Sequence, residues 1–278
     1  MKGRFRILLL AMISLSACQD DDDTMTSESG MTYLHLSHTR LDVNPLIDDA
    51  AAEINYGLYD VVMLGGDLAQ SSSADDETMI HLDTIFDLSD ETTLWSLGNH
   101  DYSDLDRIME YTDRLPYYAY HSDGVTFVVL DTQDSLSHIK GNQLDFFNDV
   151  VDTIASSSHL IVMSHKLIWM PGNAELEPMI EDVANGEFDS CNFCTNPNNF
   201  YQDLYPSLVE LEEKNVEVIC IGGDIGTREK SFSHRTAEGI DLLASGIESG
   251  DRGNQALVFE YDMSERQLTW EFVDIEEL

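Results

Sequence analysis

The sequence predicts an α/β fold in which two mixed sheets lie face to face and helices cover both outer faces. From about residue 32 onward, apolar runs typical of buried strands alternate with amphipathic helical segments. Hairpin patterns replace this alternation in the middle and at the end of the chain. The 278 residues suffice for one large core. We therefore expect a four-layer α-β-β-α sandwich over residues 32–278.

The expected elements follow in order. The first half is predicted to hold strands at 32–37, 60–64 and 93–97, and helices at 42–56, 73–86 and 103–111. In the first of these helices, Asn44 is the expected N-cap and Pro45 takes the first helical position. The second half is predicted to hold a hairpin of 117–121 and 125–130, helices at 143–154 and 204–214, and strands at 159–163, 216–221, 239–244, 255–261 and 267–273.

Residues 170–203 are rich in Gly, Pro, Asn and acidic residues, and we expect them to form an insertion loop. Long loops without regular structure usually carry a function or cover a site. In an oxidising compartment, the C-x-x-C pair of Cys191 and Cys194 is expected to close a small disulfide. The alternative of a redox-active pair lacks the surrounding strand-to-helix pattern.

The N-terminal segment predicts export. Residues 1–17 carry a basic start, a short apolar stretch and small residues just before Cys18. This pattern resembles a bacterial lipoprotein signal, which implies lipid on the Cys18 sulfur and anchoring to a membrane. The alternative is an ordinary signal peptide with an incidental cysteine. Residues 18–31 hold an acidic run and predict a flexible tether, either a surface-export signal or a solvated spacer. We expect a protein of the bacterial cell envelope, on the outer membrane or the cell surface.

The net charge of the chain limits the kinds of partner that we expect. The formal net charge is −39, and removal of a basic signal makes the mature chain still more acidic. Such a surface repels nucleic acid and acidic membranes, so we expect no nucleic-acid binding. Phosphorylated substrates are repelled too, unless local cations reverse the sign at the site. We expect a monomer.

Four metal-capable side chains stand where apolar runs end, namely Asp67, Asn99, His165 and Asp224. Ligands of α/β sheets bind at the carboxyl ends of strands, so these residues can converge. Each alone would be an ordinary turn or cap residue. Together they form a mixed oxygen and nitrogen donor set that suits Mn²⁺, Fe or Zn²⁺.

At these residues the chain resembles the calcineurin-like metallophosphoesterases. Gly-Gly-Asp67, the Gly-Asn-His-Asp run at 98–101 and the strand-terminal His165 match three of that family's motifs in order. The likeness covers about residues 32–273. It implies the metallophosphoesterase-like sandwich and two metal ions, which activate a water that attacks phosphorus in line.

The resemblance also implies roles for single residues. Asp67 would bridge both ions, and Asn99 and His165 would bind the second ion. His100 would contact the phosphate or protonate the leaving oxygen, and Asp101 would orient it.

The first and last metal motifs are degenerate. The family has Asp-x-His after the first strand, where this chain has His38-x-Arg40. The family ends with Gly-His-x-His, where this chain has Gly-Asp224-x-Gly226. Asp224 would therefore replace a histidine of the second ion. The first ion would keep only Asp67 and His38, so we expect one divalent ion or none.

Arg40 is the most informative departure, because a guanidinium stays charged and repels a cation. Two interpretations remain open. Arg40 replaces the charge of the first ion and holds a phosphate bidentately, or it neutralises carboxylates in a decayed site.

Two functional hypotheses follow. The first is a surface-anchored phosphoesterase with a remodelled, one-metal site, acting on a phosphomonoester or phosphodiester. Its substrate would be a small phosphate ester or a phosphate linked to a glycan or lipid. The second is an inactive pseudoenzyme that binds a phosphate-bearing ligand, a glycan or a protein partner at the cell surface.

Overall fold

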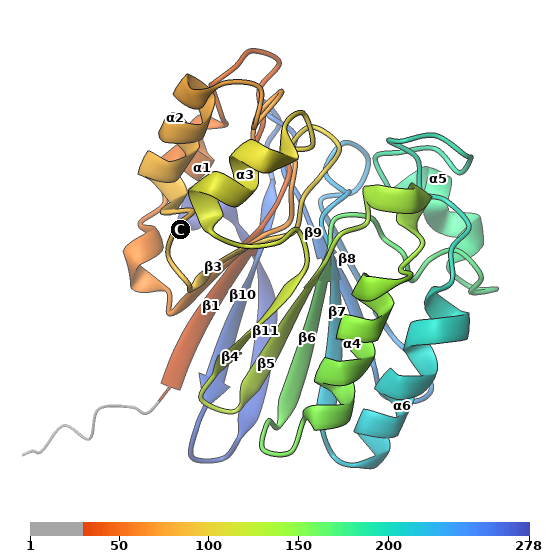
Figure 1. Cartoon of the computed structure of the whole chain (residues 1–278). Coiled ribbons are helices and arrows are strands. Elements are labelled where there is room, and N and C mark those ends of the chain that lie inside the picture. The colour runs from red at the N-terminus through yellow and green to blue at the C-terminus, as the bar shows by residue number, and fades with distance from the viewer. Residues whose placement is uncertain (1–29) are drawn as a thin grey trace, which may run out of the picture.

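The computed structural model describes residues 30–278 (Figure 1). The expected signal at 1–17 and the lipidation site Cys18 lie outside the described residues. The first strand, β1 (Gly30–Leu36), starts two residues before the expected domain boundary. Its first residues already pair with the antiparallel strand β10, so they belong to the sheet and not to the tether.

The first sheet has five strands in the order β11-β10-β1-β2-β3. Beside β1 these are β2 (Val61–Leu64), β3 (Thr93–Trp95), β10 (Gln255–Asp262) and β11 (Gln267–Asp274). β1, β2 and β3 run parallel, because a helical crossover follows each of the first two. β10 and β11 form an antiparallel hairpin beside them.

The second sheet has six strands in the order β4-β5-β6-β7-β9-β8. They are β4 (Tyr118–Ser122), β5 (Val125–Leu130), β6 (His159–Ser164), β7 (Glu217–Gly222), β8 (Ser231–Arg235) and β9 (Asp241–Ser245). β5, β6, β7 and β9 are parallel. The predicted hairpin of β4 and β5 is confirmed.

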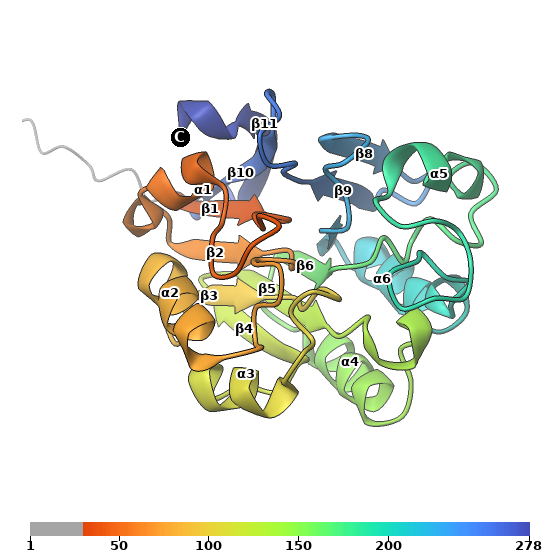
Figure 2. The ribbon, with the colours of Figure 1, turned by 90° about the horizontal axis from the view of Figure 1, so that it is seen from above.

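Helices cover both outer faces (Figure 2). They are α1 (Asp49–Glu53), α2 (Asp76–Phe86), α3 (Leu105–Thr112), α4 (Asn142–Thr153), α5 (Ile180–Val183) and α6 (Tyr205–Glu213). Shorter helical turns occupy Tyr56–Leu58, Asp134–Ser137, Glu177–Met179, Phe200–Leu204 and Ile275–Glu277. Separate apolar clusters join α1, α2 and α3 to the first sheet and α4, α5 and α6 to the second. The four-layer sandwich of two mixed sheets is thus confirmed.

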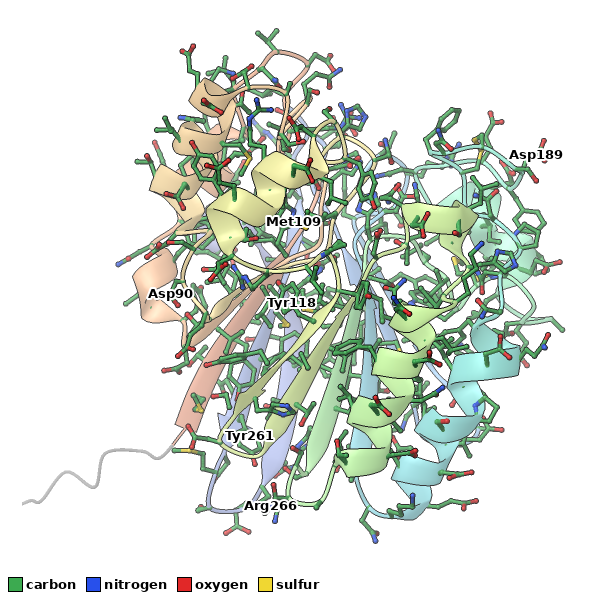
Figure 3. All side chains as sticks on the ribbon, in the orientation of Figure 1. Asp90, Met109, Tyr118, Asp189, Tyr261 and Arg266 are labelled. Carbon is green, nitrogen blue, oxygen red and sulfur yellow. A yellow bond between two sulfur atoms is a disulfide. The ribbon has the colours of Figure 1, made fainter. Side chains whose placement is uncertain are left out.

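A third apolar cluster fills the space between the sheets, with Tyr33 of the first sheet edge-on to Phe127 of the second. Tyrosine hydroxyls add polar links between the layers. The Tyr118 hydroxyl of the second sheet accepts the amide of Trp95 in β3 at 2.7 Å. Toward the other end of the strands, the Tyr261 hydroxyl lies 3.0 Å from Ser158 Oγ (Figure 3).

The first predicted helix is wrong in extent. Only Asp49–Glu53 of the range 42–56 is α-helical, with Asp48 as the N-cap. Asn44 exchanges two hydrogen bonds with the backbone of Ser71 instead, which ties this loop across to the loop after β2. In residues 30–278, no helix is long and apolar enough to cross a membrane.

Candidate functional site

The loops that follow β1, β2, β3, β6 and β7 meet at one end of the sandwich, at the top in Figure 1. Close approach between the two sheets depends on glycine. A Cβ on Gly223, after β7, would lie 2.0 Å from the carbonyl oxygen of Gly65, after β2. A Cβ on Gly98 would lie 2.0 Å from Asp67 Oδ1. The glycines of the motifs therefore bring the polar side chains of both sheets together.

Asp67 lies at the centre of this meeting point and is buried. Its Oδ2 is 3.2 Å from His38 Nε2 and 3.9 Å from Arg40 Nε. Its Oδ1 accepts the His100 amide at 2.9 Å and lies 3.7 Å from His165 Nε2. Burial alone would raise the pKa of Asp67, but His165, His38 and His100 hold that pKa below its ordinary value. The site therefore keeps a buried negative charge surrounded by basic groups.

Asp101 has a different role from the one that the resemblance implies. Its carboxylate accepts the backbone amides of Asp67 and Gly98 at 2.7 Å and that of Leu68 at 3.0 Å. Ser72 Oγ and Trp95 Nε1 also donate to it. Burial and the nearby Asp67 charge raise the pKa of Asp101. Asp101 is thus the buried group that fixes the two strand-end turns.

His100 is oriented by Gln70, so the expectation that Asp101 orients it is wrong. His100 Nδ1 lies 2.7 Å from the Gln70 carbonyl oxygen, and Arg40 Nη1 donates to Gln70 Oε1 at 2.9 Å. Gln70 therefore contacts an imidazole through its backbone oxygen and a guanidinium through its side chain. The Arg40 side chain is 23% exposed, yet its Nε is buried and has no hydrogen-bond acceptor. Sequence reasoning missed Gln70, because its backbone oxygen carries no residue-specific signal.

Lys166 is the most important residue that sequence reasoning missed. Its side chain is 1% exposed. Its Nζ donates to Asp224 Oδ2 at 2.8 Å, to Asn99 Oδ1 at 3.2 Å and to the Phe193 carbonyl at 2.9 Å. The structure therefore confirms that Asn99 and Asp224 converge, and it places an ammonium group between them.

The insertion reaches the site through Phe193. Cys191 and Cys194 are joined by a disulfide, as predicted, and the bridge encloses Phe193 in a tight loop. Asn196 braces this loop, because its Nδ2 donates to the carbonyl oxygens of both cysteines. Cys220 is a free, buried thiol with a raised pKa caused by burial.

The side chains do not fit the pair of metal ions that the resemblance implies. At the first position, His38 and Asp67 have a guanidinium beside them. At the second, the Asn99 oxygen and one Asp224 oxygen already accept from Lys166. In residues 30–278, no group of three or more His, Cys, Asp and Glu side chains is arranged to hold an ion.

His165 shows what remains of the donor set. Its Nδ1 lies 2.8 Å from the Gly65 carbonyl, while its Nε2 is buried without a hydrogen-bond partner. This Nε2 faces Asp67 Oδ1 at 3.7 Å and Asp224 Oδ1 at 3.8 Å. The donors for one ion are therefore near one another, but an internal cation engages part of the set.

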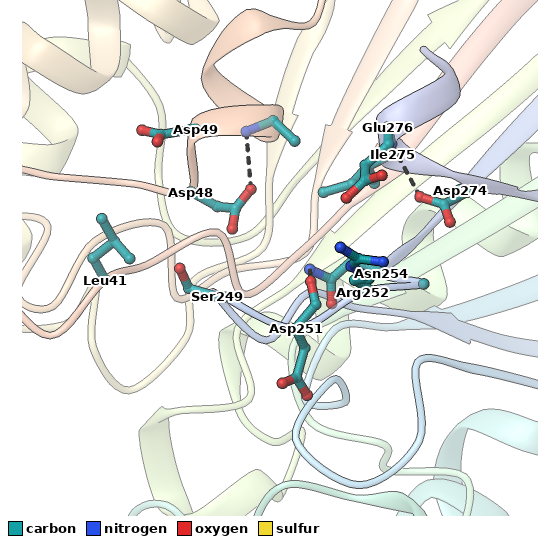
Figure 4. Close-up of a pocket in the computed structure, with 13 residues that line it drawn as sticks. Leu41, Asp48, Asp49, Ser249, Asp251, Arg252, Asn254, Asp274, Ile275 and Glu276 are labelled. Carbon is teal, nitrogen blue, oxygen red and sulfur yellow. Dashed lines mark hydrogen bonds between the residues drawn. The ribbon is translucent and has the colours of Figure 1, made fainter.

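A separate pocket of about 370 Å³ lies where the loop after β9 meets α1 and the end of β11 (Figure 4). Its lining includes the carboxylates Asp48, Asp49, Asp251, Asp274 and Glu276, together with Arg252. It shares no residue with the cluster described above. Its carboxylates repel anions, so we do not expect a phosphate ester to bind there.

No family model matches the chain. No curated protein sequence matches it either. Its structure is similar to that of a dimetal phosphatase from Danio rerio, with a TM-score of 0.53 and 12% identity over 88% of this chain and 98% of that chain.

Two longer proteins align less well. An NAD nucleotidase of Haemophilus influenzae has a TM-score of 0.45 and 13% identity over 88% of this chain and 50% of its own. A 5′-nucleotidase precursor of Thermus thermophilus has a TM-score of 0.41 and 12% identity over 88% of this chain and 54% of its own. The chain spans about half the length of these two proteins. At these identities the comparisons concern the fold alone, and the chain shares the fold of the Danio rerio dimetal phosphatase.

Proposed function

We propose that the chain binds a phosphate ester beside Arg40 and His100, and that binding needs no metal ion. The observation that carries this proposal is the placement of both side chains by Gln70. Arginine and a protonated imidazole are the donors that phosphate oxygens prefer. A guanidinium has five N–H donors and Gln70 accepts one of them, so the partly exposed Arg40 has further donors to offer such an oxygen.

Charge supports the same function. The chain as a whole repels anions, with a formal net charge of −39. Where the strand-end loops meet, Arg40, Lys166 and three histidines surround the buried carboxylates. The negative charge of the chain is thus locally compensated where a phosphate could bind. This fits the hypothesis of a ligand-binding protein on the phosphoesterase fold.

Hydrolysis of the bound ester is the second candidate function. The observation that favours it is His165 Nε2, which is unpartnered and faces two carboxylates. It predicts turnover of p-nitrophenyl phosphate or its bis-ester that appears with Mn²⁺ and disappears on chelation.

The test is calorimetric titration of the purified chain with phenyl phosphate in buffer containing EDTA. We expect binding by the wild type. Arg40→Ala should weaken it by at least about tenfold, because charge-assisted hydrogen bonds contribute about 1.5–3 kcal/mol each. Arg252→Ala is the matched control, since Arg252 is an exposed arginine of the separate acidic pocket. Absence of binding by the wild type, or equal binding by Arg40→Ala, would contradict the proposal.

We also propose that the chain is a lipoprotein of the bacterial cell envelope, anchored through Cys18. The basic, apolar and small-residue pattern before Cys18 supports this location. Metabolic labelling with palmitate, compared with Cys18→Ser, tests the anchor.

A further inference from the structure

The ammonium group of Lys166 is buried and has a hydrogen-bond acceptor for each of its N–H donors. An ammonium group has three N–H donors. Here all three have acceptors, and these come from three separate segments: Asn99 after β3, Asp224 after β7 and Phe193 in the insertion. A lysine is almost never fully buried unless it is paired in this way. The fold has therefore built a specific enclosure for one positive charge.

The position of that charge is informative. Two of the three acceptors, Asn99 and Asp224, belong to the donor set that the strand ends were expected to offer to a metal ion. The other two members are Asp67 and His165, and His165 Nε2 lies 3.7 Å from Asp67 Oδ1 and 3.8 Å from Asp224 Oδ1. The ammonium thus takes oxygen donors that a divalent cation would need.

Each buried carboxylate of the expected donor set already has a cationic side chain beside it. Asp67 lies beside Arg40 and Asp224 beside Lys166, whereas the buried Asp101 accepts only from uncharged donors. An added divalent ion would leave a buried excess of positive charge, which is costly in a water-excluded site.

We propose that the Lys166 ammonium replaces the divalent ion that Asp67, Asn99, His165 and Asp224 would otherwise hold. Lys166 is thus a built-in cation, and the insertion supplies its third acceptor through the disulfide-closed loop around Phe193. This inference deepens the proposed function, on which it rests, because it explains how the buried carboxylates are balanced without a metal ion.

The proposal predicts that removal of the ammonium creates a metal site. Lys166→Met keeps most of the side-chain volume and frees Asn99 Oδ1 and Asp224 Oδ2. We expect this variant to bind one Mn²⁺ or Zn²⁺ at least about 100-fold more tightly than the wild type. Equilibrium dialysis with elemental analysis gives the number of ions, and calorimetry gives the affinity.

Three further variants sharpen the result. Lys166→Arg keeps the charge and should bind no ion. Lys140→Met removes an exposed lysine and should behave as the wild type does. Asp224→Asn added to Lys166→Met should abolish the new site, because it removes a charged donor.

Two outcomes would overturn the proposal: one tightly held ion per wild-type chain, or a folded Lys166→Met chain that binds no ion. The wild-type measurement needs no variant, so it decides even where a variant fails to fold. Phenyl phosphate titration in EDTA, on the same wild-type preparation, reports the proposed function separately. Absence of phenyl phosphate binding by the wild type would contradict the proposed function. The metal content of the wild type and of Lys166→Met decides the role of Lys166 separately.

Discussion

Asp101 and Asp224 are both buried aspartates at strand ends, yet their carboxylates are satisfied in opposite ways. The hydrogen-bond donors to Asp101 are uncharged: backbone amides, a hydroxyl and an indole. Asp224 instead pairs with the Lys166 ammonium at 2.8 Å. The difference separates two roles within one edge of the molecule. Asp101 holds the backbone turns in shape, while Asp224 balances charge.

The largest expected effect follows from the first role. Asp101→Ala leaves the buried amides of Asp67, Leu68 and Gly98 without an acceptor, and each such loss costs about 1–3 kcal/mol. We therefore expect the free energy of unfolding to fall by about 5 kcal/mol, which is comparable to the stability of many whole domains. Urea unfolding measures it.

The matched control is Asp106→Ala, which removes an exposed aspartate of α3 and should change stability by less than about 0.5 kcal/mol. A fall below about 1 kcal/mol for Asp101→Ala would show that its hydrogen bonds do not hold the turns.

Asp224→Ala tests the second role. It leaves the Lys166 charge buried without its ionic partner, and we expect a loss of about 3 kcal/mol. Adding Lys166→Met should recover most of that loss, because the uncompensated charge is removed as well. No such rescue is possible for Asp101→Ala. A double-mutant cycle by urea unfolding measures the coupling, and strictly additive losses would contradict the ion-pair role.

His35 extends the comparison to a buried titratable group with an uncharged partner. Its expected effect on the free energy of unfolding is the smallest of the three. Its Nδ1 lies 2.8 Å from Ser245 Oγ, and burial lowers its pKa to about 3. In the unfolded chain a histidine takes up a proton below about pH 6.5. The unfolded state therefore binds more protons than the native state between these values, and His35 makes stability fall as the pH falls.

The expected slope from His35 is at most about 1.4 kcal/mol per pH unit. Unfolding free energies of the wild type and His35→Asn, measured from pH 7 to pH 5, give the slope by difference. Parallel curves of unfolding free energy against pH for the two chains would contradict this prediction, because His35 would then bind protons equally in the native and unfolded states.

Much of the fold was predictable because it depends on local patterns. Apolar runs and amphipathic segments placed nearly every strand and helix. β8 was not predicted, because its Ser-Phe-Ser-His-Arg segment lies at a half-exposed sheet edge and lacks an apolar run. The helix over 42–56 was overextended, since Asn44 bonds across the molecule to Ser71 and Asp48 caps a helix that begins only at Asp49.

The location of the site was predictable from the sequence, but the hydrogen-bond and ion-pair partners of its residues were not. Strand-end positions were enough to bring Asp67, Asn99 and Asp224 together. The acceptors of Lys166 lie 27 to 67 residues away along the chain, so no local pattern points to its role. The bonds of Asp101 to backbone amides likewise carry no sequence signal.

The contact of Gly223 with Gly65 has a consequence for how this protein can be altered. Because backbone meets backbone there, the spacing of the two sheets does not depend on which charged side chains project beside it. A designer can therefore treat geometry and chemistry as separate variables at this edge. We therefore expect substitutions of Lys166 to change the charge at this point while the spacing of the two sheets stays the same.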